Sequence, residues 1–202
     1  IQPVWPFSIS ENWNLITRTI VPVVSQPDFY TGGQGREFGL GDTTFSAFFS
    51  PSKPSKFTWG VGPVVVLPTA TDDALGQDTW SGGVSVVGLL MPGQWVIGSL
   101  LSNFWDISGD QDVNFFTWQY FVNYNFKKAK GWYLTSAPII TANWEAASGN
   151  QWTVPFGGGG GKIFRIGKQP VNAQAQAFYN VEKPENGPDW QLRLQFQLLF
   201  PK

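Results

Sequence analysis

The sequence predicts an all-β protein, an antiparallel up-and-down transmembrane β-barrel. Three observations lead to this prediction: short runs of β-forming residues recur along the chain, apolar and amide side chains alternate within those runs, and charge is scarce. Charged residues make up 13% of the 202 residues, against roughly 25% in an average soluble domain. Aromatic residues make up 16%, among them 11 tryptophans.

Eleven runs rich in Val, Thr, Phe, Tyr and Trp are separated by clusters of Gly, Pro, Asn, Asp and Lys. No window sustains helical periodicity, and no apolar stretch approaches the about 20 residues of a transmembrane helix. Nothing marks a linker, so we expect a single domain over residues 1–202. The expected strands are residues 1–9, 13–25, 39–50, 57–69, 80–91, 95–105, 113–126, 132–145, 152–166, 171–181 and 190–200.

Each run has one apolar and one polar face, because successive side chains of a strand point to opposite sides. The last run is the clearest case: Leu192, Leu194 and Phe196 alternate with Arg193, Gln195 and Gln197. A soluble sandwich would carry Lys and Glu on its polar face, whereas here that face carries mainly Asn, Gln, Ser and Thr. This pattern favours a barrel with lipid outside and a polar lumen inside. The expected pore-lining residues are Asn14, Arg18, Asp42, Thr44, Ser46, Gln119, Asn123, Asn143, Glu145, Asn172, Gln174, Gln176, Gln191, Arg193, Gln195 and Gln197.

Tryptophans lie near the ends of the expected strands. Outer-membrane barrels carry such aromatic girdles at both membrane interfaces. The expected interface residues are Trp13, Trp59, Trp80, Trp95, Trp132, Trp144, Trp152 and Trp190. We therefore expect an integral protein of the bacterial outer membrane, in contact with its lipid and lipopolysaccharide.

The connections between runs alternate between short turns and generally longer loops, as periplasmic turns and extracellular loops do. The short turns carry mostly lysine. The longer connections, 26–38, 70–79, 106–112, 146–151 and 182–189, together with Glu145, carry most of the acids. In this scheme the first and last of the eleven runs point the same way. Bacterial barrels have an even number of strands, so we expect one further strand in front of Ile1, making twelve.

Six segments together resemble a known family: Ile1-Gln2-Pro3-Val4, residues 12–20, residues 38–43, residues 59–63, residues 67–72 and residues 198–202. The family consists of bacterial outer-membrane proteins described as transporters of a phenol-degradation pathway, sometimes mislabelled neuromedin U. The resemblance covers essentially the whole chain. It implies an outer-membrane barrel with one more strand before the Ile-Gln-Pro segment.

Four charges fall on expected lumen-facing positions: Arg18, Asp42, Glu145 and Arg193. They would either select solutes by charge or form ion pairs that fill a narrow interior. Two acidic groups in the loops, Asp72-Asp73 with Asp78 and Asp110 with Asp112, have oxygen ligands for a divalent cation but lack EF-hand spacing. We interpret them as solvated acidic loops and expect no metal site.

The Gly157–Gly161 run is not a phosphate loop, because no Lys-Ser/Thr and no helix follow it. It predicts a kink or groove in the barrel wall, or, in a bolder interpretation, a lateral opening for apolar substrates. Catalysis is not expected: the chain has no cysteine and no histidine, and its acids lie in loops without an apolar setting. No cofactor is expected, and the net charge of −1 gives no basic surface for nucleic acid.

The function predicted from these features is passive passage of small molecules, aromatic or hydrophobic ones included, across the outer membrane. Two alternatives remain. One is a non-conducting structural or partner-binding barrel whose lumen is plugged, for which the 26–38 loop is long enough. The other is a soluble lipid-binding barrel.

Overall fold

The computed structural model describes the chain except residues 28–35, 54–55, 110, 186 and 201–202. This part of the chain is all-β, with one short 3-10 helix, η1 (Asp73–Leu75). The strands are β1 (Val4–Ser8), β2 (Trp13–Ile20), β3 (Val23–Pro27), β4 (Arg36–Leu40), β5 (Thr43–Pro51), β6 (Phe57–Leu67), β7 (Thr79–Leu90), β8 (Trp95–Gly109), β9 (Asn114–Asn125), β10 (Trp132–Ser136), β11 (Ile139–Asn143), β12 (Trp152–Ile166), β13 (Gln169–Glu182) and β14 (Trp190–Leu198).

The main sheet follows the order of the chain. Its strand order is β1-β2-β5-β6-β7-β8-β9-β10-β12-β13-β14, and β11 pairs with both β12 and β9. The strands β3 and β4 form a separate two-stranded sheet between β2 and β5 in sequence. The predicted all-β class and antiparallel meander order are therefore confirmed. The twelfth strand in front of Ile1 stays a prediction.

Three predicted runs are each divided in two. Run 13–25 becomes β2 and β3, which are separated by Val21 and Pro22, and run 39–50 becomes β4 and β5. Run 132–145 becomes β10 and β11, separated by Ala137 and Pro138. At Pro22 and Pro138 the backbone has no N–H to donate to a ladder. When each of these three pairs is counted as one strand, the fourteen strands observed among the described residues correspond to the eleven predicted runs.

Two predicted loops were partly wrong. Residues 26–27 and 36–38, predicted as loop, belong to the β3–β4 hairpin. The strand β8 extends to Gly109, beyond the predicted end at residue 105, because the Asp106 N–H donates to the Val113 carbonyl at 3.0 Å. The connection to β9 is correspondingly short.

The structure divides into two compact units. One consists of Ile1–Ser55, Trp59–Val87 and Ser102–Phe116, and the other of Lys56–Thr58, Gly88–Leu101 and Thr117–Lys202. The strands β6, β7, β8 and β9 contribute residues to both. The single domain over residues 1–202 stays a prediction.

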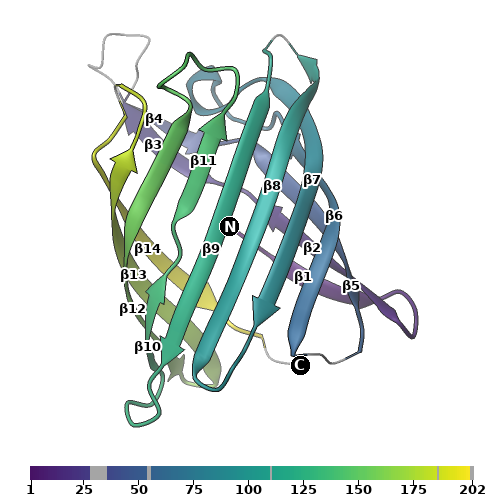
Figure 1. Ribbon diagram of the computed structural model, residues 1–202, viewed down its shortest axis with the longest axis vertical. Coiled ribbons are helices and arrows are strands. Elements are labelled where there is room, and N and C mark those ends of the chain that lie inside the picture. Colours follow the sequence, from purple (N-terminus) through teal and green to yellow (C-terminus); the bar gives the residue numbers. More distant parts are fainter. Residues whose placement is uncertain (28–35, 54–55, 110, 186, 201–202) are drawn as a thin grey trace. The chain divides into compact units, whose positions relative to one another are not determined.

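In the second unit β12, β13 and β14 lie side by side (Figure 1). A two-residue turn joins β12 to β13, and its Gly167 has a φ of 61°, a left-handed conformation that glycine adopts without strain. The β12–β13 ladder shifts register between Val154 and Pro155. Beyond that irregularity the pairing runs from Pro155 to Ile166, so the whole glycine run is held in a regular antiparallel ladder.

Candidate functional site: an amide-lined cavity

The strands β13 and β14 have an apolar face that is exposed and a polar face that is more buried. In β14, Leu194 is 72% and Phe196 62% exposed, whereas the intervening glutamines and Arg193 are only partly exposed. The register pairs Gln174 with Gln195 and Gln176 with Arg193, which places these polar side chains on one face. This is the reverse of a soluble sheet, whose apolar face is the buried one.

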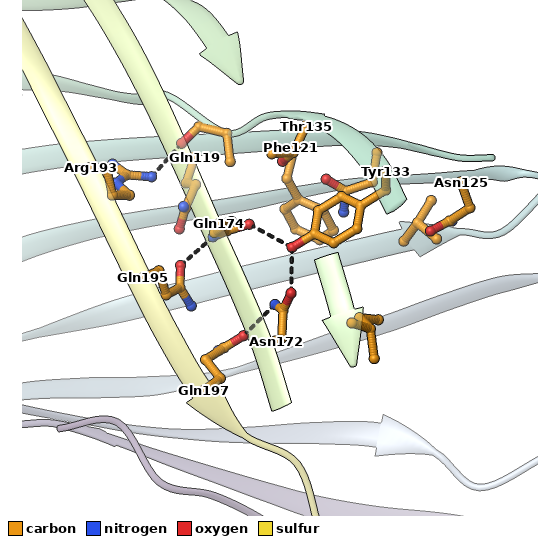
Figure 2. Close-up of a pocket in the computed structure, with 14 residues that line it drawn as sticks. Gln119, Phe121, Asn125, Tyr133, Thr135, Asn172, Gln174, Arg193, Gln195 and Gln197 are labelled. Atoms are coloured by element: carbon orange, nitrogen blue, oxygen red, sulfur yellow. Dashed lines mark hydrogen bonds between the residues drawn. The ribbon is translucent and has the colours of Figure 1, made fainter. Parts of the chain in front are cut away.

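The polar face of the second unit borders a cavity of about 440 Å³. Its lining comes from β8, β9, β10, β12, β13 and β14, together with Ala137 after β10 (Figure 2). We call it the amide-lined cavity, because amides outnumber every other kind of side chain around it. The lining residues are Val96, Gln119, Phe121, Asn123, Asn125, Tyr133, Thr135, Ala137, Ile163, Asn172, Gln174, Arg193, Gln195 and Gln197.

A hydrogen-bond network connects Tyr133 of β10 to the strands β13 and β14. The Tyr133 hydroxyl lies 2.6 Å from Asn172 Oδ1 and 3.0 Å from Gln174 Oε1, either of which can accept its proton (Figure 2). Asn172 Nδ2 in turn donates to Gln197 Oε1 at 2.9 Å, and Gln174 Nε2 donates to Gln195. The cavity wall is thus held in place by neutral amides, which can both donate and accept.

The Tyr133 ring lies against the backbone of Gly161. A Cβ added to Gly161 would lie only 2.3 Å from the Tyr133 Cζ and hydroxyl oxygen atoms. Because any side chain there would displace the ring, Gly161 permits the position from which Tyr133 reaches Asn172 and Gln174. One glycine of the Gly157–Gly161 run therefore shapes the cavity directly.

Arg193 brings the positive charge of the cavity. Its Nη1 donates to the Ala137 carbonyl at 2.6 Å, and its guanidinium lies 5.4 Å from the centroid of the Phe178 ring. Within the described residues no carboxylate forms an ion pair with it.

Seven predicted pore-lining residues line this cavity: Gln119, Asn123, Asn172, Gln174, Arg193, Gln195 and Gln197. Two more lie beside it on the same strands. Gln176 is 1% exposed and accepts a 2.9 Å hydrogen bond from the Ala137 N–H, and Gln191 donates to Asn180 at 2.9 Å. Sequence reasoning missed Tyr133 and Thr135, although their alternation with Trp132 and Leu134 was a usable signal.

The other predicted pore residues are not in this cavity. Asn14, Arg18, Asp42, Thr44 and Ser46 belong to the first unit. Asn14 Oδ1 accepts from the Ser8 hydroxyl at 3.1 Å, and Ser46 is buried. Asn143 ends β11 with an exposed side chain, and Glu145 lies in the following turn instead of the expected strand position.

Asp42 supports a loop. It lies between β4 and β5, and its two carboxylate oxygens accept from the backbone N–H groups of Ala70 at 3.2 Å and Gln77 at 2.8 Å. Asp42 therefore fixes the segment that leads from β6 to β7. The assignment of Asp42 to charge selection, made from alternation alone, overlooked these two non-local partners.

The acidic loop beside Asp42 forms a small hollow of about 40 Å³, which Asp72, Asp73 and Asp78 also line. Asp72 caps η1, with its Oδ1 accepting from the Ala74 N–H at 2.9 Å. No group of three or more ligating side chains with the geometry of a metal site occurs among the described residues. In the second predicted acidic group, Asp110 with Asp112, Asp110 lies outside the residues that the structure describes.

All eight predicted interface tryptophans are exposed, and they lie at or beside strand ends. Trp13, Trp95, Trp132, Trp152 and Trp190 are the first residues of their strands. Within the first unit Trp13 and Trp59 pack edge to face at 6.1 Å between ring centroids, and in the second Trp144 and Trp152 do so at 5.3 Å. Exposed tryptophans at strand ends are the arrangement that girdles require.

No protein-family model, curated protein or solved structure matches the chain. The resemblance to the phenol-degradation transporters therefore stays a prediction. Among the residues that the structure describes, no helix is long and apolar enough to cross a membrane. The fold and the cavity define a class of protein. Its antiparallel meander sheet has one exposed apolar face, and its other face borders an amide-lined cavity.

Replacing Tyr133 by phenylalanine should destabilise the protein by about 1 kcal/mol, the usual net value of a hydrogen bond. The variant keeps the ring against Gly161 but removes the donor to Asn172 and Gln174. Tyr179→Phe is the matched control, because Tyr179 is exposed. Urea midpoints measured in detergent compare the two variants, and equal midpoints would contradict a structural role for this network.

Proposed function

We propose that this protein is an integral outer-membrane β-barrel that lets small molecules, aromatic or hydrophobic ones included, pass passively through an amide-lined lumen. The observation that carries the proposal is the polarity of β14: Leu194 and Phe196 are exposed, and Gln195 and Gln197 line the cavity. Exposed apolar surface on this scale is stable only against a partner or a lipid phase. Lipid fits best, because tryptophans mark the strand ends.

The meander order supports closure into a barrel. Every backbone polar group within a bilayer must find a partner inside the protein, which only helices and closed barrels achieve. A sheet whose strands pair in chain order closes when its first and last strands come together. In this proposal the apolar face is turned to lipid and the amide face to the lumen.

Passage through such a lumen needs no conformational cycle. Asn and Gln side chains offer hydrogen bonds that a solute can exchange for those of water, so no single step holds it strongly. Arg193 adds a positive charge without a counter-ion among the described residues, which favours anions or solutes with an electron-rich group. The resemblance to phenol-degradation transporters agrees with an aromatic solute.

Single-channel conductance of the detergent-purified protein in a planar bilayer tests the proposal, with discrete steps expected. Arg193→Gln should lower the anion-over-cation permeability ratio. A unit charge roughly 8 Å from an ion in water contributes about 0.5 kcal/mol, which corresponds to about a twofold change.

Lys162→Gln is the matched control, because Lys162 lies 4.9 Å from the Trp132 ring and outside the cavity lining. A ratio that changes equally in both variants would contradict a role for Arg193 in the lumen. Silence from protein that is demonstrably inserted would favour the alternative function, a structural or partner-binding barrel with a plugged lumen.

A further inference from the structure

An apolar groove lies on the face of the sheet opposite the amide-lined cavity. Its volume is about 420 Å³, and its lining consists of Trp95, Val122, Tyr124, Leu134, Thr135, Ser136 and Gly159. Side chains alternate along β10, so that Tyr133 and Thr135 line the cavity, whereas Leu134 and Ser136 line the groove. Thr135 borders both. The cavity and the groove are therefore separated by little more than the sheet itself.

The sheet is thin at this place. The β10 residues pair with glycines of β12, Leu134 with Gly160 and Thr135 with Gly159. Neither glycine has a side chain to fill the groove or the cavity. Between them, the glycine run and Thr135 leave a wall that is mostly backbone.

The ladder is also interrupted here. The pairs between β10 and β12 end at Thr135 and Gly159, and the pairs between β11 and β12 resume at Thr141 and Thr153. In between, Pro138 has no N–H to donate. The Ser136 hydroxyl bridges part of the interval by donating to the Gly157 carbonyl at 2.7 Å.

Side chains from the cavity face hold the interrupted segment. The Ala137 N–H donates to Gln176 Oε1 at 2.9 Å, and the Ala137 carbonyl accepts from Arg193 Nη1 at 2.6 Å. Both backbone groups of Ala137 thus bind residues of β13 and β14 instead of a neighbouring strand. Isolated hydrogen bonds of this kind can break one at a time, whereas the hydrogen bonds of a strand ladder break together with those beside them.

We propose that the interrupted ladder between Ser136 and Gly158, which the Ser136–Gly157 hydrogen bond closes in this structure, opens as a lateral port. Through it, small aromatic molecules bearing a hydrogen-bonding group move between the lipid and the amide-lined cavity. The port deepens the proposed function and rests on it. The apolar body of such a molecule fits a groove lined by Trp95, Tyr124 and Leu134. Its polar end meets the amides and the Tyr133 hydroxyl once it has passed Thr135.

The size of the groove agrees with this class of molecule. An apolar cavity of about 150 Å³ holds one benzene ring, so about 420 Å³ accommodates one or two rings. We call the hydrogen bonds of Arg193 and Gln176 to Ala137 the latch, because they hold this segment in place on the cavity side. Opening the latch would free two backbone groups and two polar side chains, which could then bind the polar end of the entering molecule.

A reversible disulfide tests the port. The chain has no cysteine, and a Cβ at position 158 would lie 3.3 Å from the Ser136 Cβ, close to the spacing that a disulfide needs. It would also lie 2.8 Å from the Thr135 carbonyl oxygen, so the two strands must move slightly apart to admit it. The double variant S136C/G158C is placed in vesicles whose outer leaflet is lipopolysaccharide. Entry of fluorescent 1-naphthol and conductance of KCl are measured before and after reduction.

We expect the oxidised protein to admit 1-naphthol at least about fivefold more slowly than the reduced protein, with unchanged KCl conductance. An entry rate that oxidation does not alter would overturn the port and assign the groove to a lipid acyl chain. Absence of both conductance and naphthol entry in the unsubstituted protein would instead overturn the proposed function. If oxidation slows 1-naphthol entry and the protein shows no KCl conductance, the port is the sole route by which 1-naphthol enters.

A single cysteine provides a second test if the double variant does not fold. Ser136→Cys labelled with N-ethylmaleimide places a bulky group in the groove and should slow naphthol entry similarly. Leu192→Cys with the same label is the control, because Leu192 is exposed on β14 and outside the groove lining. Equal rates in the two labelled proteins would overturn the port.

Discussion

Replacing Gly159 by alanine is expected to prevent β12 from pairing with β13 in its native register. A Cβ at this position would lie 1.9 Å from the Ala175 carbonyl oxygen and 2.8 Å from the Gln176 Cα. Both are backbone atoms of the adjacent strand, so neither can rotate away. The cost should exceed the about 1–3 kcal/mol of ordinary overpacking. Loss of the folded band on unheated SDS gels and a lowered urea midpoint in detergent would report it.

Gly160→Ala is the matched control from the same run. Its Cβ would meet only the Tyr133 carbonyl oxygen, at 3.4 Å, an ordinary contact distance. We expect this variant to fold like the unsubstituted protein, or to gain a few tenths of a kcal/mol from the reduced freedom of its unfolded chain. Similar stability of the two variants would contradict the close approach of β12 and β13.

An arginine at position 194 should block membrane insertion. Leu194 is the central residue of β14 and is 72% exposed on its apolar face. A charge on the lipid face of a barrel costs about 2–4 kcal/mol at the bilayer midplane. We expect Leu194→Arg to reduce the inserted fraction in lipid vesicles, measured by protection from added protease, by more than tenfold, because about 1.4 kcal/mol already corresponds to tenfold.

The adjacent substitution Gln195→Arg is the control. Gln195 lines the cavity and is the partner of Gln174, so its charge would enter a polar space and leave insertion nearly intact. If the apolar face contacted protein or solvent instead of lipid, Leu194→Arg would lower the inserted fraction no more than Gln195→Arg does. Leu194→Arg would then raise solubility without detergent, and the outer-membrane proposal would fail.

The polar face of the cavity could be predicted where it depends on local alternation. Gln195 and Gln197 could be assigned to one face of a strand from their spacing alone, because the side-chain period of a strand is two. The same reasoning placed the tryptophans at strand ends and identified the all-β class. Each of these features is determined within one strand.

The tertiary structure decided what depends on partners far apart in the chain. Asp42 was predicted as a pore charge, but it accepts hydrogen bonds from the N–H groups of Ala70 and Gln77. These residues follow Asp42 by 28 and 35 positions in the chain. Glu145 was assigned to a strand that ends two residues earlier.

The division between β10 and β11 likewise needs Arg193 and Gln176, which are 56 and 39 positions from Ala137. Composition and alternation therefore determined by themselves the all-β class and the polar face of regular strands such as β14. The register between strands determined which polar groups meet. It is set by the packing of the whole ladder, and no short segment of the sequence contains it.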